Sequence, residues 1–356
     1  MTDLLERCAA LVDIPSVSHH EAAITDHLEA FLRGLPGLEV TRLENNVVAR
    51  TQLGRSSRLI LAGHTDTVPV NGNDRARVDG DVLWGLGAAD MKAGLAVFCL
   101  LAETIPEPAV DVTYVFYECE EVATEFNGLP KLLAQRPDLL AGDAAILGEP
   151  TGAVVEAGCQ GAMRVAITLA GARAHTARPW MGRNAIHRLA PILERLARYD
   201  ERRPVIDGCE FREALQAVAI DGGVAGNVVP DRAVLKVNHR YAPDRDAASA
   251  LAHVLDVLVP DLDEAGGDRV ELLDDAAPAP PSLDHPLLSG LVRRTGQPPR
   301  AKLGWTDVSF FAQAGIPATN FGPGEPTVAH SADERVERSQ LESVHTTLAA
   351  LLTEGA

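Results

Sequence analysis

The sequence lacks several features that mark large classes of protein. It has no CxxC pair, and its five cysteines are scattered, which predicts neither a disulfide framework nor a thiolate zinc site (Cys8, Cys99, Cys119, Cys159 and Cys209). No stretch approaches the roughly 18 uninterrupted apolar residues of a membrane span. The N-terminus has acidic residues early and no long apolar stretch, so no signal peptide is expected. These absences favour a protein of the reducing cytoplasm with no membrane partner.

Positive charge is also scarce. The chain of 356 residues has 32 Lys and Arg against 50 Asp and Glu, which gives a formal net charge of −18. Nucleic-acid binding needs a basic footprint to neutralise phosphates, so no nucleic-acid partner is expected. The length is sufficient for two domains with a large core.

The first part of the chain alternates apolar strands with helices. Amphipathic or apolar segments of helical length are expected at Thr25–Arg33, Met91–Ile105 and, more briefly, Phe126–Gln135. Short aliphatic runs at Arg58–Asp66, Val110–Glu118 and Asp143–Pro150 predict buried strands. Alternation of strands and helices is typical of an α/β domain with a largely parallel sheet.

The pattern then changes to the order β-α-β-β-α-β, which is typical of the ferredoxin-like motif. The elements expected are strands at Ala162–Gly171, 213–223, Arg232–Tyr241 and 268–274, and helices at Asn184–Tyr199, kinked at Pro191, and Asp246–Val259. After a Pro/Ala-rich linker the α/β pattern returns with a helix at Val308–Ala314, a strand at 316–322 and a last helix after Glu337. The predicted fold class is therefore α/β: a catalytic domain with a largely parallel central sheet at 1–160 and 276–356, interrupted by an inserted ferredoxin-like domain at 161–275.

Potential metal ligands stand where the expected strands of the α/β domain end or a helix begins. These residues are His64, Asp66, Asp90, Glu120, Glu121, Glu149 and His330. Taken singly, each has a simpler explanation, such as a helix N-cap or a solvated surface residue. In an open α/β sheet, however, ligands bind outside the carboxyl ends of the strands. Two histidines and several acids gathered there, without cysteines, indicate a borderline to hard divalent ion such as Zn²⁺, Mn²⁺ or Co²⁺.

Charge favours two ions over one. If Asp90, Glu121 and Glu149 are ligands, their charges and that of a bridging hydroxide are balanced by two divalent cations. Because adjacent residues of an extended strand point to opposite sides, we expect Glu121 to bind metal and Glu120 to remain free as a base. Asp66, two residues after His64, is expected on the same side, where it orients the imidazole. Glu118 is expected on the side of Glu120, without an assigned role.

Together these residues resemble the M20 family of metallopeptidases and deacylases. The motifs that carry the resemblance are "GHTDTVP" (Gly63–Pro69), "GLGAADMKAG" (Gly85–Gly94), "CEE" (Cys119–Glu121), "GEPT" (Gly148–Thr151) and "AHSADE" (Ala329–Glu334). The resemblance implies that Asp90 bridges two metals, most simply Zn²⁺, with His64 and Glu149 at one and Glu121 and His330 at the other. It further implies Glu120 as general acid/base and Asp66 as the residue that orients His64.

Within the family, further stretches are similar to desuccinylases of the actinobacterial type, which implies hydrolysis of N-succinyl-L,L-2,6-diaminopimelate, an anionic N-acyl amino acid. The inserted domain then forms a homodimer, and His175 in "AHTARP" reaches the partner's site. The resemblance also implies substrate contacts from Arg178, Asn227, Arg240, Gly304 and Thr306. Departures from the proteobacterial enzymes, such as the lead-in Glu118-Cys119, affect the pocket for the acyl group and leave the metal ligands intact.

Three other readings stay open at this point. Another M20 hydrolase, such as an acetylornithine deacetylase, an aminoacylase or a dipeptidase, would share the metal ligands. A thiol hydrolase could use Cys119, although two neighbouring acids would raise the pKa of its thiol and weaken it as a nucleophile. A metal-binding protein without catalysis would have no use for Glu120 as a spare base.

Overall fold

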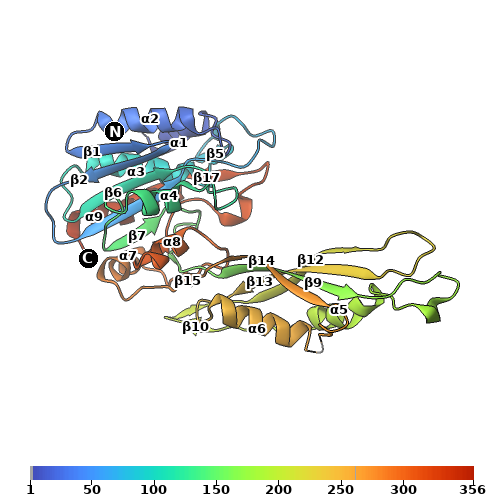
Figure 1. Cartoon of the computed structure of the whole chain (residues 1–356). Coiled ribbons are helices and arrows are strands. Elements are labelled where there is room, and N and C mark those ends of the chain that lie inside the picture. The colour runs from blue at the N-terminus through green and yellow to red at the C-terminus, as the bar shows by residue number, and fades with distance from the viewer. Residues whose placement is uncertain (1–2, 261) are drawn as a thin grey trace. The chain divides into compact units, whose positions relative to one another are not determined.

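The computed structural model describes residues 3–260 and 262–356, and the chain divides into two compact units (Figure 1). The larger unit comprises Met1–Gly158, Pro281–Ala301 and Thr306–Ala356. The smaller unit comprises Cys159–Pro280 and Lys302–Trp305, so it is inserted into the sequence of the larger one. Among the described residues, no helix is both long and apolar enough to cross a membrane.

The larger unit is built on a mixed sheet with the strand order β1-β2-β6-β3-β7-β16-β8-β15. Its strands are β1 (Leu38–Leu43), β2 (Asn46–Thr51), β3 (Arg58–His64), β6 (Asp111–Tyr117), β7 (Ala144–Leu147), β8 (Glu156–Ala157), β15 (Arg300–Ala301) and β16 (Ala318–Asn320). The four central strands β6, β3, β7 and β16 run parallel. Strands β6 and β7 are buried at every residue, as expected when both faces of a parallel sheet are covered.

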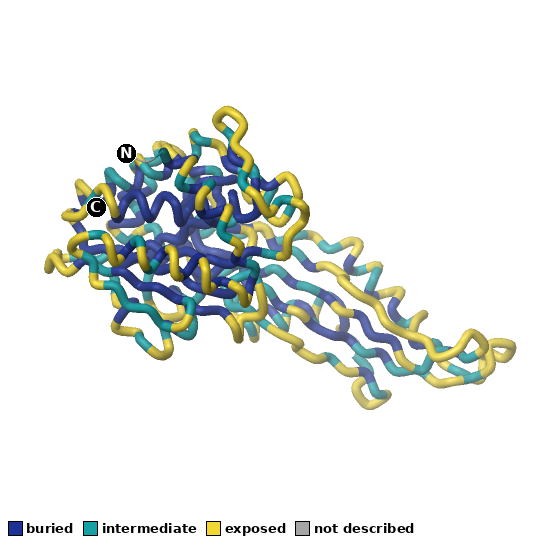
Figure 2. Tube along the Cα trace, turned by 90° about the horizontal axis from the view of Figure 1, so that it is seen from above, coloured by how far each residue is buried: buried dark blue, intermediate teal, exposed yellow. Residues whose placement is uncertain are grey.

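Helices cover this sheet and complete the core, which Figure 2 shows in dark blue. They are α1 (Leu4–Val12), α2 (Ala22–Arg33), α3 (Lys92–Thr104), α4 (Gly128–Gln135), α7 (Pro286–Thr295), α8 (Val308–Gln313) and α9 (Arg338–Glu354). Helix α3 is apolar on all sides because it packs against α1, α9 and β3 together. A small separate sheet has the order β17-β5-β4 and consists of β4 (Arg77–Asp79), β5 (Val82–Trp84) and β17 (Arg335–Glu337).

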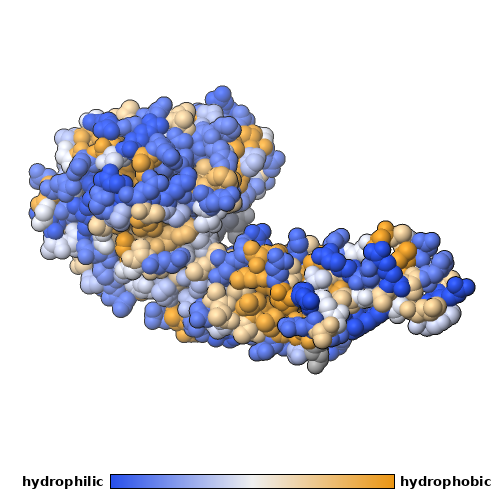
Figure 3. Space-filling view, viewed as in Figure 1, coloured by the Kyte–Doolittle hydropathy of each residue, from blue (hydrophilic) through white to orange (hydrophobic). Residues whose placement is uncertain are grey.

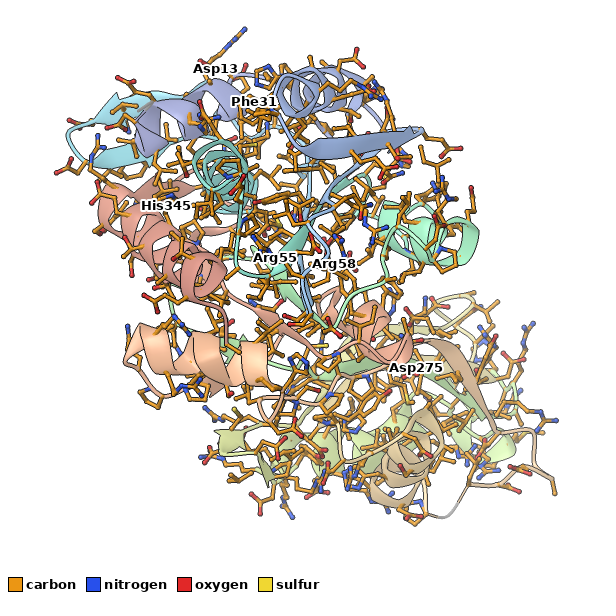
Figure 4. All side chains as sticks on the ribbon, turned by 90° about the vertical axis from the view of Figure 1, so that its left-hand side faces the viewer. Asp13, Phe31, Arg55, Arg58, Asp275 and His345 are labelled. Carbon is orange, nitrogen blue, oxygen red and sulfur yellow. The ribbon has the colours of Figure 1, made fainter. Side chains whose placement is uncertain are left out.

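The amino ends of the central strands are held by one carboxylate. Asp111, at the start of β6, accepts hydrogen bonds from the Thr51 hydroxyl at 2.6 Å and from the backbone N–H groups of Leu53 and Arg55, both at 2.9 Å. Arg58, which begins β3, lies beside Arg55 (Figure 4) and forms an ion pair with Asp111 at 3.7 Å. These polar groups satisfy one end of the sheet and leave the carboxyl ends of the strands free for function.

The smaller unit has an antiparallel sheet of order β12-β13-β9-β14 with two helices in its core. Its main elements are β9 (Gly161–Ala170), α5 (Ala190–Ala197), β12 (Ala214–Gly222), β13 (Arg232–Tyr241), α6 (Ala247–Leu258) and β14 (Arg269–Ala276). Strands β10 (Val205–Ile206) and β11 (Cys209–Glu210) form a separate two-stranded sheet, and two 3-10 turns lie at Pro179–Met181 and His187–Leu189. A third 3-10 turn, Pro326–Val328, lies in the larger unit. The sequence of elements confirms the predicted α/β fold class with an inserted β-α-β-β-α-β segment.

Two local expectations are wrong. Pro191 does not kink a long helix, because it lies in the first turn of α5, where its missing N–H leaves no intrahelical bond unmade. Glu120 and Glu121 do not continue an extended strand, because β6 ends at Tyr117 and a turn follows. Cys119 in this turn has a positive φ of 59°. The pleat of a strand therefore does not send the two glutamates to opposite sides.

Candidate metal centre

The central strands deliver their following residues to one edge of the sheet. His64 ends β3 and is in register with Tyr117, which ends β6. Because β7 is parallel to β3 and pairs Leu147 with Ala62, Glu149 follows at the same edge. Asp90 lies just before α3, and the His330 side chain reaches the Asp90 carboxylate from the loop that follows β16.

The structure brings five of the predicted residues into two overlapping groups that share Asp90. One group is His64, Asp90 and Glu149; the other is Asp90, Glu121 and His330, and within each group the ligand atoms lie within 4.8 Å of one another. One Asp90 oxygen lies 3.1 Å from His64 Nε2, and the other lies 3.4 Å from His330 Nε2. His330 Nε2 is also 2.9 Å from Glu121 Oε1. Asp90 thus presents a different oxygen to each histidine, which is the arrangement of a carboxylate that bridges two metals.

The donor set fits divalent metal ions. With bonds of about 2.05 Å, the nitrogen and oxygen ligands of tetrahedral zinc stand about 3.3 Å apart, close to the separations around Asp90. Imidazole nitrogens and carboxylate oxygens are the ligands that Zn²⁺, Co²⁺ and Mn²⁺ accept. His64, Asp90 and Glu149 could hold one ion, and Asp90, Glu121 and His330 could hold the second.

The protonation states of the histidines and acids in this group depend on one another. Burial alone would lower the pKa of His64, but hydrogen bonds to Asp66 and Asp90 raise it well above its ordinary value. Hydrogen bonds to Asp90 and Glu121 raise the pKa of His330 to about 10. Burial opposes ionisation of Asp90, yet hydrogen bonds from both histidines hold its pKa below the usual range. Without metal, protons on the imidazoles balance the acids, so a metal must displace these protons when it binds.

Asp66 is fully buried and supports both the first histidine and the turn with the two glutamates. Its Oδ1 lies 3.4 Å from His64 Nδ1 and accepts a hydrogen bond from the Glu120 N–H at 3.0 Å. Its Oδ2 accepts from the Glu121 N–H at 3.1 Å and from the Ser18 hydroxyl at 2.8 Å. The backbone oxygen of Asp66 is nearer to His64 Nδ1, at 3.1 Å. Asp66 therefore positions more of the site than the imidazole assigned to it from the sequence.

Glu120 lies beside the ligands rather than on a separate side. One oxygen of Glu120, one of Glu121 and a nitrogen of His64 are mutually within 4.8 Å. Burial, and next the charge of Asp307, raise the pKa of Glu120 well above its ordinary value. A carboxyl group with a raised pKa beside a metal centre can accept a proton and return it near neutral pH.

Two buried acids at this site received no role from the sequence. Glu334 accepts hydrogen bonds from the backbone N–H groups of Gly87, Ala89 and Asp90 at 3.0–3.1 Å, and it thereby fixes the segment that carries the bridging residue. Asp307, completely buried, accepts from the Asn127 side-chain amide, and burial raises its pKa to about 6. Glu334 ends the motif "AHSADE" and Asp307 follows the predicted contact Thr306, so their positions next to site residues were a usable signal. Their hydrogen-bond partners could not be predicted from the sequence.

Comparison with known proteins identifies the family. A family model described as peptidase family M20/M25/M40 matches residues 60–354. The chain belongs to this family. A Mycobacterium tuberculosis protein described as a putative succinyl-diaminopimelate desuccinylase is 54% identical over 335 residues, which cover 94% of this chain and 93% of the relative. A succinyl-diaminopimelate desuccinylase of Corynebacterium glutamicum is 47% identical and covers 97% of this chain and 94% of its own.

Solved structures agree on the fold of this M20 chain. A Staphylococcus aureus tripeptidase superposes with a TM-score of 0.79 at 23% identity, covering 99% of this chain and 97% of its own. A Bacillus subtilis protein described as a dinuclear metal-binding peptidase of the M20 family superposes with a TM-score of 0.70 at 17% identity, covering 98% and 96%.

The smaller unit of the M20 chain carries the predicted catalytic residue His175 and three of the predicted substrate contacts, in two places. His175 and Asn227 lie on neighbouring loops, since His175 forms a bridge with Val228 and the Thr176 N–H donates to the Asn227 oxygen at 3.0 Å. Arg178 follows in the same loop, and its N–H donates to the His175 oxygen. Arg240 lies near the other end of β13, which begins at Arg232, so a distance on the order of 25 Å along the strand separates it from the first three.

The remaining predicted contacts, Gly304 and Thr306, lie where the chain passes from the smaller unit, Lys302–Trp305, back to the larger one. Gly304 is exposed and belongs to the smaller unit, whereas Thr306 is buried in the larger unit and donates a hydrogen bond to Asn320 Oδ1 at 3.0 Å.

The hypothesis that this M20 chain is a thiol hydrolase has little support. Cys119 is buried, and burial raises the pKa of its thiol to about 12, the opposite of what a nucleophile needs.

Proposed function

We propose that this M20 chain removes the succinyl group from N-succinyl-L,L-2,6-diaminopimelate and releases succinate and L,L-diaminopimelate, a step in lysine and peptidoglycan synthesis. The observation that carries the proposal is the pair of ligand groups sharing Asp90 with Glu120 beside them. The relatives at 54% and 47% identity, both described as succinyl-diaminopimelate desuccinylases, support this substrate over other N-acyl amino acids.

The ligand sets proposed are His64, Asp90 and Glu149 for one ion and Asp90, Glu121 and His330 for the other. We propose zinc at both positions, with cobalt or manganese as substitutes, because the donors are nitrogen and oxygen atoms. When bound, the ions supply Lewis acidity, which polarises the substrate carbonyl and lowers the pKa of a water molecule.

Glu120 is the residue that moves the proton. It accepts a proton from the attacking water as the new C–O bond forms at the amide carbon and the carbonyl oxygen becomes an oxyanion. Glu120 then gives this proton to the amide nitrogen as the C–N bond breaks, so that water is divided between carboxylate and amine and no redox change occurs. The buried Asp66 keeps the backbone of Glu120 in place during these steps, because it accepts the Glu120 N–H.

The substrate carries several carboxylates, and a chain of net charge −18 needs local positive charge to bind them. Arg240 and Arg178 offer a guanidinium suited to a carboxylate, and Asn227, Gly304 and Thr306 offer further polar contacts. His175 is proposed to donate a hydrogen bond to the oxyanion of the transition state. Because His175 pairs with Val228, which precedes β13, and Arg240 lies near the far end of that strand, we propose that one substrate molecule reaches both only if they come from different subunits.

A homodimer through the smaller unit would provide this arrangement. Strand β12 is an edge strand of its sheet, and the side chains of Val218 and Ile220 on it are 57% and 52% exposed. Figure 3 shows apolar side chains, in orange, on the surface of this unit. An edge strand with exposed apolar residues pairs readily with a second copy. We therefore propose the larger unit as the catalytic domain and the smaller unit as the dimerisation domain, in a cytoplasmic enzyme whose cysteines are all free.

The deciding experiment is hydrolysis by protein reconstituted with Zn²⁺ or Co²⁺. Release of succinate from N-succinyl-L,L-diaminopimelate is compared with hydrolysis of N-acetylornithine, other N-acyl amino acids and dipeptides at equal concentration. We expect kcat/KM for the succinyl substrate to exceed that for each other substrate by at least about 100-fold, because a site that hydrogen-bonds a substrate group discriminates against analogues without that group by up to about 10⁴- to 10⁵-fold. Comparable rates on an acetyl substrate or a dipeptide would assign the chain to another M20 activity.

A further inference from the structure

A second set of potential ligands surrounds Cys119 and is separate from the residues that share Asp90. The Cys119 thiol donates to Glu21 Oε1 at 3.2 Å and lies 3.5 Å from His19 Nδ1. Glu21, Glu118 and Cys119 each present a ligand atom within 4.8 Å of the other two. All three are buried, and only His19 is exposed.

The spacing of these atoms suits tetrahedral zinc. With a Zn–S bond of about 2.3 Å and a Zn–N or Zn–O bond of about 2.05 Å, sulfur stands about 3.5 Å from the other ligand atoms. The observed distances from Cys119 Sγ are 3.5 Å to His19 Nδ1 and 3.2 Å to Glu21 Oε1. Glu118 presents an oxygen within 4.8 Å of both the sulfur and Glu21. His19 is near the sulfur only and lies outside this group, so its exposed ring must turn toward an ion held by the other three residues.

Glu21 gives an independent indication that a cation belongs here. Its side chain is 0% exposed, and Oε1 accepts from the N–H of His19 and the N–H and thiol of Cys119. Its other oxygen, Oε2, is buried and has no hydrogen-bond partner within residues 3–260 and 262–356. A buried carboxylate oxygen without a donor is costly, and a metal ion bound by both oxygens of Glu21 would supply the missing partner.

The surrounding charge is also compatible with a bound ion. A thiolate and two carboxylates would carry three negative charges, of which a divalent ion neutralises two. Lys131 Nζ lies 3.5 Å from Glu118 Oε1 and can balance the third. The site would then be neutral as a whole, which a buried position requires.

We propose that Glu21, Glu118 and Cys119 form an auxiliary site for Zn²⁺ or a similar thiophilic divalent ion, and that the exposed His19 ring turns onto the ion as a fourth ligand. Binding forms a metal–sulfur bond and releases the thiol proton to solvent, without oxidation or reduction. Because Cys119 directly precedes Glu120 and Glu121, the ion fastens the turn that carries these glutamates to the loop that carries His19 and Glu21. This assignment gives Glu118 a role as a ligand, and it does not depend on the substrate proposed for the enzyme.

Cobalt titration of the full-length, metal-free protein tests the proposal. The set that shares Asp90 has no sulfur ligand, so a thiolate-to-cobalt charge-transfer band in the near ultraviolet can arise only from a site with cysteine. We expect three Co²⁺ per chain and this band in the wild type. Cys119→Ser should lose the band and bind two Co²⁺. Cys209 is a buried cysteine of the smaller unit, and Cys209→Ser should keep the band and all three Co²⁺.

His19→Ala is the second variant, and because His19 is exposed, its removal should leave the fold intact. It should weaken binding of the band-producing ion by about tenfold or more, and circular dichroism checks that each variant is folded. A wild-type protein that binds two Co²⁺ without the band overturns the proposal, and so does a band that persists in Cys119→Ser. Failure to hydrolyse the succinyl substrate would leave these spectral results unchanged, so the two proposals fail separately.

Discussion

Replacement of Asp66 by Asn tests how the site is supported, because the two side chains have the same shape and differ in hydrogen bonding and in one negative charge. In the native protein Asp66 Oδ1 accepts from the Glu120 N–H, and Oδ2 accepts from the Glu121 N–H and the Ser18 hydroxyl. An asparagine has only one acceptor oxygen, so its NH₂ group must face one of the two backbone N–H donors in either orientation. If the NH₂ group takes the position of Oδ1, it also meets His64 Nδ1 and favours the wrong tautomer.

The size of the effect follows from these contacts. One buried N–H left without an acceptor costs about 1–3 kcal/mol of the free energy of unfolding. Loss of a partner that orients a metal-binding histidine lowers metal affinity by about 10- to 100-fold. Urea unfolding of the metal-free protein measures the first quantity, and competition with a chromophoric chelator measures the second. Ser18→Ala is the matched control: it removes one hydrogen bond worth about 1 kcal/mol and keeps both backbone contacts.

The reasoning is refuted if Asp66→Asn matches the wild type in both unfolding free energy and metal affinity. It is also refuted in part if Ser18→Ala reduces metal affinity as strongly as Asp66→Asn does, since the hydroxyl would then carry the effect that we assign to the backbone contacts. A crystal structure of the asparagine variant would show which N–H has lost its acceptor.

Three further predictions concern charge. Glu120→Gln should keep both metals by elemental analysis yet lose at least about 100-fold in kcat, the scale of general acid–base catalysis; loss of a metal would make Glu120 a ligand instead. Metal binding at pH 7 should release protons, because hydrogen bonds to carboxylates raise the pKa values of His64 and His330; calorimetry in buffers of different ionisation enthalpy measures this release, and a value of zero would contradict protonated imidazoles in the metal-free protein. Ion pairing with Arg188 and backbone hydrogen bonds outweigh the effect of burial and lower the pKa of Asp268 to about 2. The ionised Asp268 should therefore stabilise the fold by roughly 2 kcal/mol above about pH 4, and this contribution should be lost as the pH falls through 2. Asp268→Asn should remove this part of the acid dependence, and an acid unfolding curve unchanged by the substitution would show that the ion pair contributes nothing.

Much of the fold could be predicted from the sequence because the decisive signals are local. The central strands β3, β6 and β7 are mainly apolar runs, and their buried positions agree with that interpretation. The small sheet of β4, β5 and β17 could not be predicted, since each of its strands has three residues and so short a segment carries no periodicity. The prediction of a strand through the turn after β6 is wrong because nothing in "YECEEV" marks a positive φ at Cys119.

The ligands of the candidate site could be placed from the sequence, but the residues that hold them could not. His64, Asp90, Glu121, Glu149 and His330 stand next to strand ends or a helix start, and that position is itself the signal. Their supports depend on partners far away in the chain: Glu334 binds the Asp90 N–H across 244 residues, and Asp307 binds Asn127 across 180. A single sequence gives no information on such distant pairs, however clear its local pattern.

Two of these supports share one physical principle. Turns that present several ligands leave backbone N–H groups without helix or sheet partners, and buried donors of this kind must be satisfied. Asp66 accepts the N–H groups of Glu120 and Glu121, and Glu334 accepts those of Gly87, Ala89 and Asp90. Each acid binds the main chain of a ligand-bearing segment and leaves the ligand side chains free. The turn and the segment that carry the ligands are therefore held by hydrogen bonds to the main chain before any ion binds, while hydrogen bonds from His64 and His330 stabilise the charge of Asp90 between them.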